Sequence, residues 1–188
     1  PILGSCAISG YGVGEVLSFI CNFAPVHCEK GTIEVDGKTV ETKDDAPFTG
    51  RVFKTVVDPF VGKISYLKIM SGSLSLSTPL YNANKDVNEK AGALYVMCGK
   101  KQQTVDKAYC GDIVALTKLS QTETCDTLCT KDFVVKYPPI EYPRPMLGMA
   151  ISPKTKDDED KMSDALKKIL IEDKSINLVR NAETGEQV

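Results

Sequence analysis

The sequence predicts a mainly β protein, in which a short helix precedes an antiparallel β-barrel and a partial α+β unit follows it. Three observations support this fold class. Short runs rich in Val, Ile, Leu and Tyr repeat between residues 48 and 119, with turn sequences and no helical pattern between them. Apolar residues at helical spacing occur only towards the two ends. A composition of 42% hydrophobic and 26% charged residues suits a globular chain with a core.

The first element is a helix predicted over about 13–24. Pro25 follows the run and ends it. The apolar residues at helical spacing are Val13, Val16, Leu17, Phe19, Ile20 and Phe23. The glycines just before it do not form a dinucleotide-binding GxGxxG loop, because Glu15 stands where the third glycine belongs.

A hairpin is predicted next. Asp36-Gly37 lies between Ile33 and Val35 on one side and Val40 on the other, which is the pattern of a type I′ turn. The acidic stretch Lys-Asp-Asp-Ala-Pro that follows is typical of a linker.

Five apolar runs then predict the strands of the barrel, which closes its own sheet edges. They are RVFKTVV, KISYLKIM, LSLSTPLYN, GALYVMCG and DIVALTKL. Between the first two lies DPFVGK, residues 58–63, whose Gly-Lys pair is similar to the end of a phosphate-binding P-loop. Val57 replaces the required first glycine and Ile64 replaces the required Ser or Thr. We therefore expect a turn here.

Four prolines within residues 138–145 predict a stiff connector that takes part in no regular pairing. After it, MLGMAISP (146–153) predicts a strand. A helix beginning at Thr155 or Lys156 carries one apolar face, made of Met162, Ala165, Leu166, Ile169 and Leu170. Ile176 begins another predicted strand. We expect the first β-α-β of an α+β sandwich without its second half. The absence of an initial Met predicts a chain that starts within a longer protein or has been processed.

The cysteines and the single histidine predict neither a metal site nor a catalytic residue. No CxxC pair occurs, and Cys125 and Cys129 have no second ligand pair. His27 adjoins Cys28, but no nucleophile motif surrounds them. We expect reduced thiols in a cytoplasmic protein, most of them small core residues. No apolar run approaches the roughly 20 residues of a membrane helix.

Charge is distributed unevenly along the chain. Residues 47–131 hold 11 Lys/Arg against 7 Asp/Glu, whereas residues 1–46 hold 3 against 7. The middle segment is therefore the part best suited to approach a polyanion.

Six motifs in order give the chain a resemblance to elongation factor G, a translational GTPase. The resemblance covers nearly the whole sequence. The six motifs are Ala46-Pro47-Phe48 with Val52-Phe53-Lys54; Asp58 to Ile64; Ser71-Gly72 with Leu74; Gly111 to Ala115; Asp126 to Cys129; and Ile151 to Lys156 with Asp160-Lys161-Met162.

The resemblance implies a division into five parts. Residues 1–28 would be the C-terminal tail of the GTPase domain and 29–46 a hairpin and linker. Residues 47–136 would be the domain II barrel, 137–145 the Pro-rich connector, and 146–188 the first half of a ferredoxin-like domain III.

The resemblance also implies a remnant guanine-nucleotide motif at Gly4-Ser5-Cys6, where a backbone N–H reads the guanine oxygen. Asn84-Lys85-Asp86 imitates the family's base reader, but Val87 follows it and the segment is predicted to be a barrel turn. GTP and Mg²⁺ are implied for the intact protein. We expect this chain to bind no cofactor by itself and to hydrolyse no GTP.

The implied partner is the ribosome, through small-subunit RNA, with Lys100, Lys101 and Lys107 as candidate contacts. We expect a monomer that binds no membrane. Cys125 replaces the family's usual Gly, and residues 97–103 depart from its histidine-containing loop, which predicts a divergent member.

Two alternatives remain beside a translocation factor. One is a ribosomal-protection GTPase, of the kind that confers tetracycline resistance, with the same architecture. The other is a free-standing β-barrel binding module without a GTPase partner.

Overall fold

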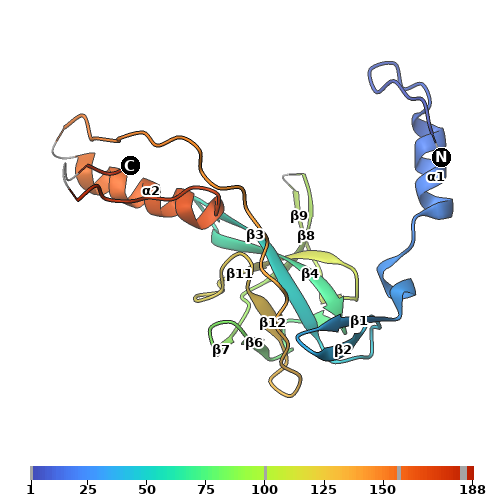
Figure 1. The fold of residues 1–188 in the computed structure, drawn as a ribbon. Coiled ribbons are helices and arrows are strands. Elements are labelled where there is room, and N and C mark those ends of the chain that lie inside the picture. Colours follow the sequence, from blue (N-terminus) through green and yellow to red (C-terminus); the bar gives the residue numbers. More distant parts are fainter. Residues whose placement is uncertain (1, 100, 156–157, 183–185) are drawn as a thin grey trace.

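The computed structural model describes residues 2–99, 101–155, 158–182 and 186–188. Helix α1 (Val13–Phe23) stands away from a central β-barrel, and helix α2 (Glu159–Glu172) lies on the other side with extended segments beside it (Figure 1). The predicted mainly β fold, with one short helix before the barrel and one helix after it, is confirmed.

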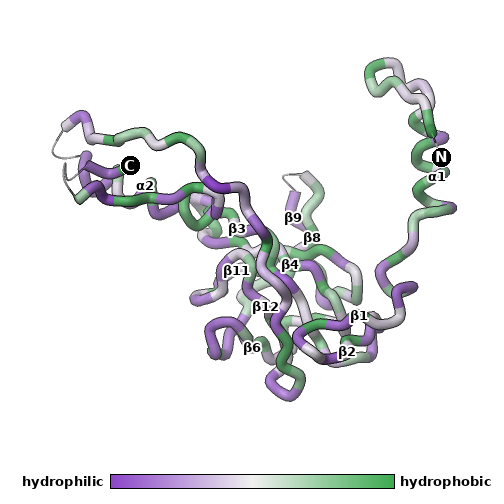
Figure 2. The backbone as a smooth tube through the Cα atoms, viewed as in Figure 1, coloured by the Kyte–Doolittle hydropathy of each residue, from purple (hydrophilic) through white to green (hydrophobic). Residues whose placement is uncertain are grey.

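Helix α1 forms within one residue of its predicted end. None of its residues is buried, and Val13, Leu17, Ile20 and Phe23 keep between 39% and 70% of their surface exposed. Figure 2 shows this uncovered hydrophobic stretch along the helix. The apolar face that predicted the helix therefore has no packing partner among the described residues.

The segment after α1 is fastened to the barrel. A 3-10 helix, His27–Lys30, brings the His27 Nε2 to 2.9 Å from the Met70 carbonyl oxygen. The Cys28 thiol lies 3.7 Å from the Cys110 carbonyl oxygen. These contacts fix the point at which the N-terminal part joins the barrel.

Strands β1 (Thr32–Val35) and β2 (Lys38–Glu41) form the predicted hairpin. Asp36 and Gly37 both have positive φ, 54° and 70°, as a type I′ turn requires. The hairpin packs Val35 and Val40 against Val135 and Tyr137 in a small cluster outside the main core.

The barrel contains an eight-stranded antiparallel sheet in the order β7-β6-β12-β3-β4-β11-β8-β9 and a small sheet of β5 and β10. The strands are β3 (Thr49–Asp58), β4 (Gly62–Ser71), β5 (Leu74–Ser75), β6 (Leu80–Asn82), β7 (Val87–Glu89), β8 (Leu94–Cys98), β9 (Lys101–Thr104), β10 (Lys107–Ala108), β11 (Ile113–Thr117) and β12 (Thr127–Cys129). All five predicted runs contribute strands.

One core fills the barrel, and both sheets contribute to it. Leu67, Leu94, Leu116 and Leu128 from the large sheet and Leu74 from the small one are each 1% exposed or less. Burial of such side chains contributes about 2 kcal/mol each, so this cluster is the main source of stability.

The DPFVGK stretch is the turn between β3 and β4, as predicted. The Asp58 Oδ1 accepts hydrogen bonds from the backbone N–H groups of Phe60 and Val61, both at 2.8 Å. The Val61 and Phe60 N–H groups lower the pKa of the Asp58 carboxyl group. The groups that would cradle a phosphate in a P-loop are here closing a hairpin.

Gly72 explains why two of the family motifs occur together. Its φ is +72°, and a Cβ at this position would lie 2.5 Å from the Ala46 carbonyl oxygen and 2.7 Å from the Phe48 Cα. Only glycine satisfies both conditions. The Ser71-Gly72 turn therefore packs directly on the Ala46-Pro47-Phe48 segment at the entrance to the barrel.

A buried carboxylate, that of Glu89, binds the loop that follows β11. Glu89, 9% exposed, accepts hydrogen bonds from Gln121 N and Thr122 N, both at 2.7 Å, and further bonds from Ser120. The Lys63 Nζ donates to the carbonyl oxygens of Ser120 and Thr122. Residues 120–122 are thus held between one acidic and one basic side chain.

The C-terminal part differs from the prediction in three places. The predicted strands over 146–153 and from Ile176 are wrong: among the described residues only isolated bridges form there, Ile151 with Gln187 and Arg180 with Gln187. Helix α2 begins at Glu159 rather than Thr155, and the alternative start at Lys156 lies outside the described residues. Residues 137–145 form no helix or strand, as predicted.

Helix α2 and its continuation contact the barrel. The Glu172 Oε1 accepts a 2.6 Å hydrogen bond from the backbone N–H of Val57, on β3. The Glu123 carboxylate lies between the Lys174 Nζ at 3.1 Å and the Lys85 Nζ at 2.8 Å. These contacts set the direction in which α2 leaves the barrel.

The expectation that most cysteines are core residues is wrong. All seven are free, Cys110 and Cys129 are buried, and Cys6, Cys21, Cys28 and Cys98 are exposed. Burial, together with the neighbouring Cys28 thiol, raises the pKa of Cys110 to about 12, so this thiol stays protonated.

Candidate nucleic-acid interface

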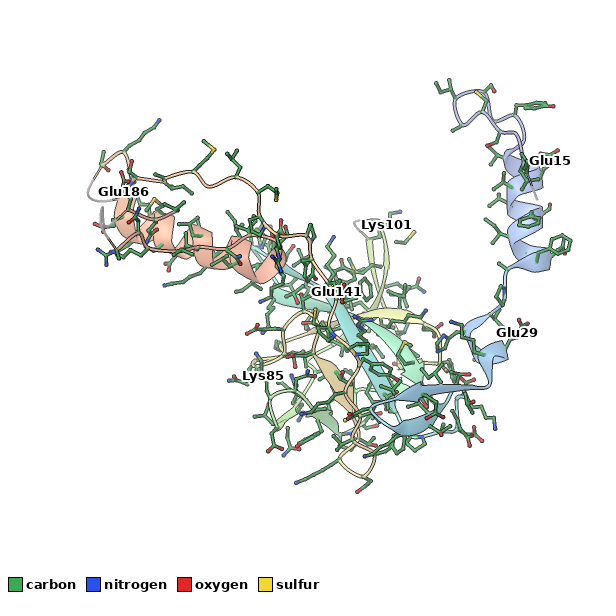
Figure 3. All side chains as sticks on the ribbon, in the orientation of Figure 1. Glu15, Glu29, Lys85, Lys101, Glu141 and Glu186 are labelled. Carbon is green, nitrogen blue, oxygen red and sulfur yellow. The ribbon has the colours of Figure 1, made fainter. Side chains whose placement is uncertain are left out.

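The hairpin of β8 and β9 projects from the barrel and carries one of the candidate RNA contacts. Cys98 and Lys101 face each other across its turn. Lys101 is exposed, as are the other three residues of β9, and Figure 3 shows it at the end of the hairpin, away from the barrel. Lys100 lies outside the described residues.

Lys107 begins the next strand, β10, and is exposed. Its Nζ lies 5.2 Å from the centre of the Tyr109 ring, and 47% of the Tyr109 surface is exposed. The Tyr109 backbone N–H is bound by the Asp112 Oδ2 at 2.8 Å, which fixes the start of the following turn. A cation beside an exposed aromatic ring presents both charge and a stacking face to a nucleic acid.

Lys101 and Lys107 thus lie on two consecutive strands, β9 in the large sheet and β10 in the small one. Neither side chain forms an ion pair within the described part of the chain. Their charges are therefore not neutralised by a nearby carboxylate, as a phosphate-binding surface requires.

Two further basic residues, Arg51 and Lys68, were not selected from the sequence. They face each other on β3 and β4 beside a cavity on the outer face of the sheet. Each lies at an outward-facing position of a predicted strand. The sequence held no other indication that these two residues belong to a binding site. Finding the pair needed the register of the two strands.

The Gly4-Ser5-Cys6 segment forms an exposed, closed loop before α1. The Cys6 backbone N–H donates to the Tyr11 carbonyl oxygen at 2.8 Å. A Cβ on Gly12 would lie 2.2 Å from the Gly4 carbonyl oxygen, so glycine is required at this position. Hydrogen bonds from the Ser9 side chain and backbone lower the pKa of the Cys6 thiol.

This loop does not by itself fit a guanine nucleotide with Mg²⁺. The Cys6 N–H, which would read the guanine oxygen, is already bonded to Tyr11. Within residues 2–99, 101–155, 158–182 and 186–188, no three His, Cys, Asp or Glu side chains gather in a way that could hold a metal ion.

Two models of known protein families match successive parts of the chain. The model described as Elongation factor G domain 2 matches residues 47–131, and that of Elongation Factor G, domain III matches residues 142–188. Together they match well over half of the sequence. The chain belongs to the elongation factor G family.

Individual proteins agree with this family membership. Elongation factor G from two strains of Dehalococcoides mccartyi, BAV1 and CBDB1, is 35% identical to the whole chain over 194 aligned residues. A crystal structure of a protein from Thermus thermophilus matches 94% of the chain with a TM-score of 0.76 and 30% identity. The chain spans 28% of the curated relatives and 25% of that crystallised chain.

The glycine that the resemblance implies at position 125 would suit the backbone found there. Cys125 has a φ of 79°, in the left-handed region that glycine adopts without strain. Its sulfur lies 3.5 Å from the backbone nitrogen of Ile140, in the Pro-rich connector. Cys125 therefore combines a backbone conformation that favours glycine with a contact to the connector.

Asn84 is part of the barrel rather than a base reader. Its Oδ1 accepts a 2.8 Å hydrogen bond from the Thr127 backbone N–H, and Asp86 has a φ of 58° in the turn between β6 and β7. The prediction that residues 84–86 form a barrel turn is confirmed.

Across the described ranges, no helix has both the length and the apolar character needed to cross a membrane.

Proposed function

We propose that the chain is part of a translational GTPase that docks on the ribosome and couples GTP hydrolysis to the movement of tRNA and mRNA. In that intact protein, these residues supply docking and a mechanical connection between domains, and they carry no catalytic group. The observation that carries the proposal is the succession of two elongation factor G domains along one chain.

Docking is assigned to the barrel, residues 47–136. Lys101 and Lys107 are exposed and have no ion-pair partner within the described part of the chain. Lys100 joins them on the basis of the sequence. Lysines bind RNA through phosphate oxygens, so the three residues would give affinity and orientation rather than sequence recognition. The partner would be small-subunit ribosomal RNA.

The mechanical connection is assigned to the Pro-rich connector 137–145 and the part that follows it, 146–188. The hydrogen bond from Val57 to Glu172 couples α2 to β3, and the ion pair between Lys174 and Glu123 couples the segment after α2 to the barrel. A stiff connector with a few polar contacts permits rotation between two preferred positions better than a large apolar interface does.

The nucleotide would bind outside these residues. GTP and Mg²⁺ belong to the intact protein, and residues 1–28 would be the tail of its GTPase domain, followed by the hairpin and linker 29–46. Gly4, Ser5 and Cys6 would contact guanine after the Cys6 N–H is released from Tyr11. The uncovered apolar face of α1 would pack on the rest of that domain. The protein would be cytoplasmic, and this part of it a monomer.

Neither alternative has comparable support. A free-standing barrel module would not require the second family match at residues 142–188. A ribosomal-protection GTPase shares the architecture, but the relatives at 35% identity are named elongation factor G. A translocation assay with the intact protein separates these two kinds of GTPase.

The proposal is tested by GTP turnover of the intact protein with and without ribosomes. We expect strong stimulation by ribosomes and movement of mRNA by one codon per cycle. The variants Lys101→Gln and Lys107→Gln should each raise the ribosome concentration needed for half-maximal turnover and lower its salt slope by about 1. Lys90→Gln, an exposed lysine after β7, is the matched control. Turnover that ribosomes do not stimulate would contradict the proposal.

A further inference from the structure

A pair of like charges lies on the outer face of the large sheet. Arg51 on β3 is the register partner of Lys68 on β4, and Lys68 is the register partner of Ile113 on β11. Like charges at directly opposed positions of antiparallel strands destabilise the sheet. Both side chains are half-buried, which reduces the screening by water.

Neither cation has a counter-charge in the part of the chain that the structure describes. No hydrogen bond or ion pair from either side chain to a carboxylate is present there. The Arg51 Nε is buried and has no hydrogen-bond partner. The two unneutralised cations, rather than the enclosed Nε atom, favour an anion as the ligand at this place.

The two cations border a cavity of about 340 Å³. Its remaining lining residues are Phe53, Met70, Ile113 and Tyr137, and none of the six is acidic. The Tyr137 hydroxyl is hydrogen-bonded to the Thr49 Oγ1 at 2.8 Å, so this residue presents its ring and not its polar atom. The cavity thus has cationic groups beside apolar and aromatic walls.

We propose that this cavity binds one unpaired ribonucleotide of a single-stranded RNA segment. Arg51 and Lys68 bind the backbone phosphate, for which the planar guanidinium group provides two parallel N–H donors. The base lies against the walls formed by Phe53, Met70 and Ile113. A volume of about 340 Å³ lies within the range of small-molecule sites and accommodates one nucleotide.

This inference deepens the proposed function, because it rests on the barrel meeting RNA, but it concerns different residues. Lys101 and Lys107 offer exposed charge for phosphates. The Arg51 cavity adds a site that distinguishes an unpaired nucleotide from a duplex, since a paired base cannot enter it.

The experiment measures binding of a fluorescein-labelled RNA heptamer of mixed sequence to the 188-residue chain by fluorescence anisotropy. Arg51→Gln and Lys68→Gln should each raise the Kd about fivefold or more and lower the salt slope by about 1. Lys54→Gln, on the same strand but outside the cavity lining, should change the Kd less than about twofold. Ile113→Ser should weaken binding of the heptamer but not of an abasic oligomer of equal length.

Fold controls keep the result interpretable. Arg51→Gln removes an unneutralised charge pair, so its melting temperature should equal or exceed that of the unchanged chain. Arg51→Lys retains the charge but loses the paired donors, and its Kd should lie between those of the unchanged chain and Arg51→Gln.

Three results would overturn the inference. They are equal Kd values for the cavity variants and Lys54→Gln, equal binding of a duplex and a single strand, and tighter binding of an Asp/Glu-rich heptapeptide than of RNA.

Co-sedimentation of the intact protein with ribosomes separates this inference from the proposed function. Ribosome binding without Arg51-dependent RNA binding rejects the cavity alone. Arg51-dependent RNA binding without co-sedimentation supports the cavity and rejects the proposed function.

Discussion

The backbone N–H of Val57 donates a 2.6 Å hydrogen bond to the Oε1 of Glu172, which joins the end of β3 to the last residue of α2. More than 100 residues separate the two in the sequence. A charged acceptor makes this bond stronger than one between neutral groups. Together with the ion pair between Lys174 and Glu123, it joins the barrel to the C-terminal part.

Loss of this acceptor should loosen the link between α2 and the barrel. In Glu172→Ala the Val57 amide has no partner, and we expect its hydrogen exchange to accelerate while the amides of β4 keep their rates. Glu172→Gln retains an acceptor oxygen and should have a smaller effect. Glu159→Ala, at the exposed first turn of α2, is the control. If the Val57 amide exchanged equally fast in Glu159→Ala, the effect would come from loosening of the whole helix and not from loss of the acceptor.

Glu89 should be a strong determinant of barrel stability. Glu89→Ala leaves the buried Thr122 N–H and the neighbouring Gln121 N–H without an acceptor, and we expect a loss of about 3 kcal/mol in the free energy of unfolding. Glu141→Ala, in the exposed connector, should change it by less than about 0.5 kcal/mol. Urea unfolding measures both, and equal losses would refute the role assigned to Glu89.

The same carboxylate makes a pH prediction. Burial raises the pKa of Glu89, but hydrogen bonds from Gln121, Thr122 and Ser120 outweigh it and lower the pKa below its ordinary value. A carboxyl group with a lowered folded-state pKa contributes stability above its unfolded pKa, about 4.3, and loses it as the pH falls. Unfolding free energy should therefore decline more steeply below about pH 4.3 in the unchanged chain than in Glu89→Gln. Parallel pH profiles would contradict this.

Cys125 should be a site where glycine stabilises the chain. Its φ of 79° costs a non-glycine residue about 1 kcal/mol, and Cys125→Gly removes this strain. Cys125→Ala keeps the strain and loses the sulfur contact with Ile140, so it should unfold at lower temperature than the unchanged chain. If both variants melt earlier, the contact with the connector outweighs the backbone strain. Calorimetry measures the two melting temperatures.

Features set by neighbouring residues were predicted well. The Asp36-Gly37 turn, the Asp58–Lys63 turn and the helix at Val13–Phe23 depend on local backbone geometry and spacing, and all three form as expected. The order of strands along the chain follows for the same reason. Lys101 and Lys107 are exposed, although they lie on strands β9 and β10 and not in turns, and their contact with RNA stays a prediction.

The two wrong strand predictions have one physical origin. A strand needs a partner to satisfy its backbone groups, and the apolar runs at 146–153 and from Ile176 find only isolated bridges among the described residues. Cysteine content likewise does not fix burial. Cys98 lies exposed in a projecting hairpin, whereas Cys129 lies within the sheet.

By itself, the sequence determined the mainly β class, the sequence of elements and the resemblance to elongation factor G, because periodicity, turn residues and ordered motifs are local properties. Tertiary structure alone decided which distant residues meet. The pairing of Arg51 with Lys68 depends on strand register, and the contact of Val57 with Glu172 depends on the direction in which α2 leaves the barrel. Both follow from the packing of the whole chain, which no short stretch of sequence encodes.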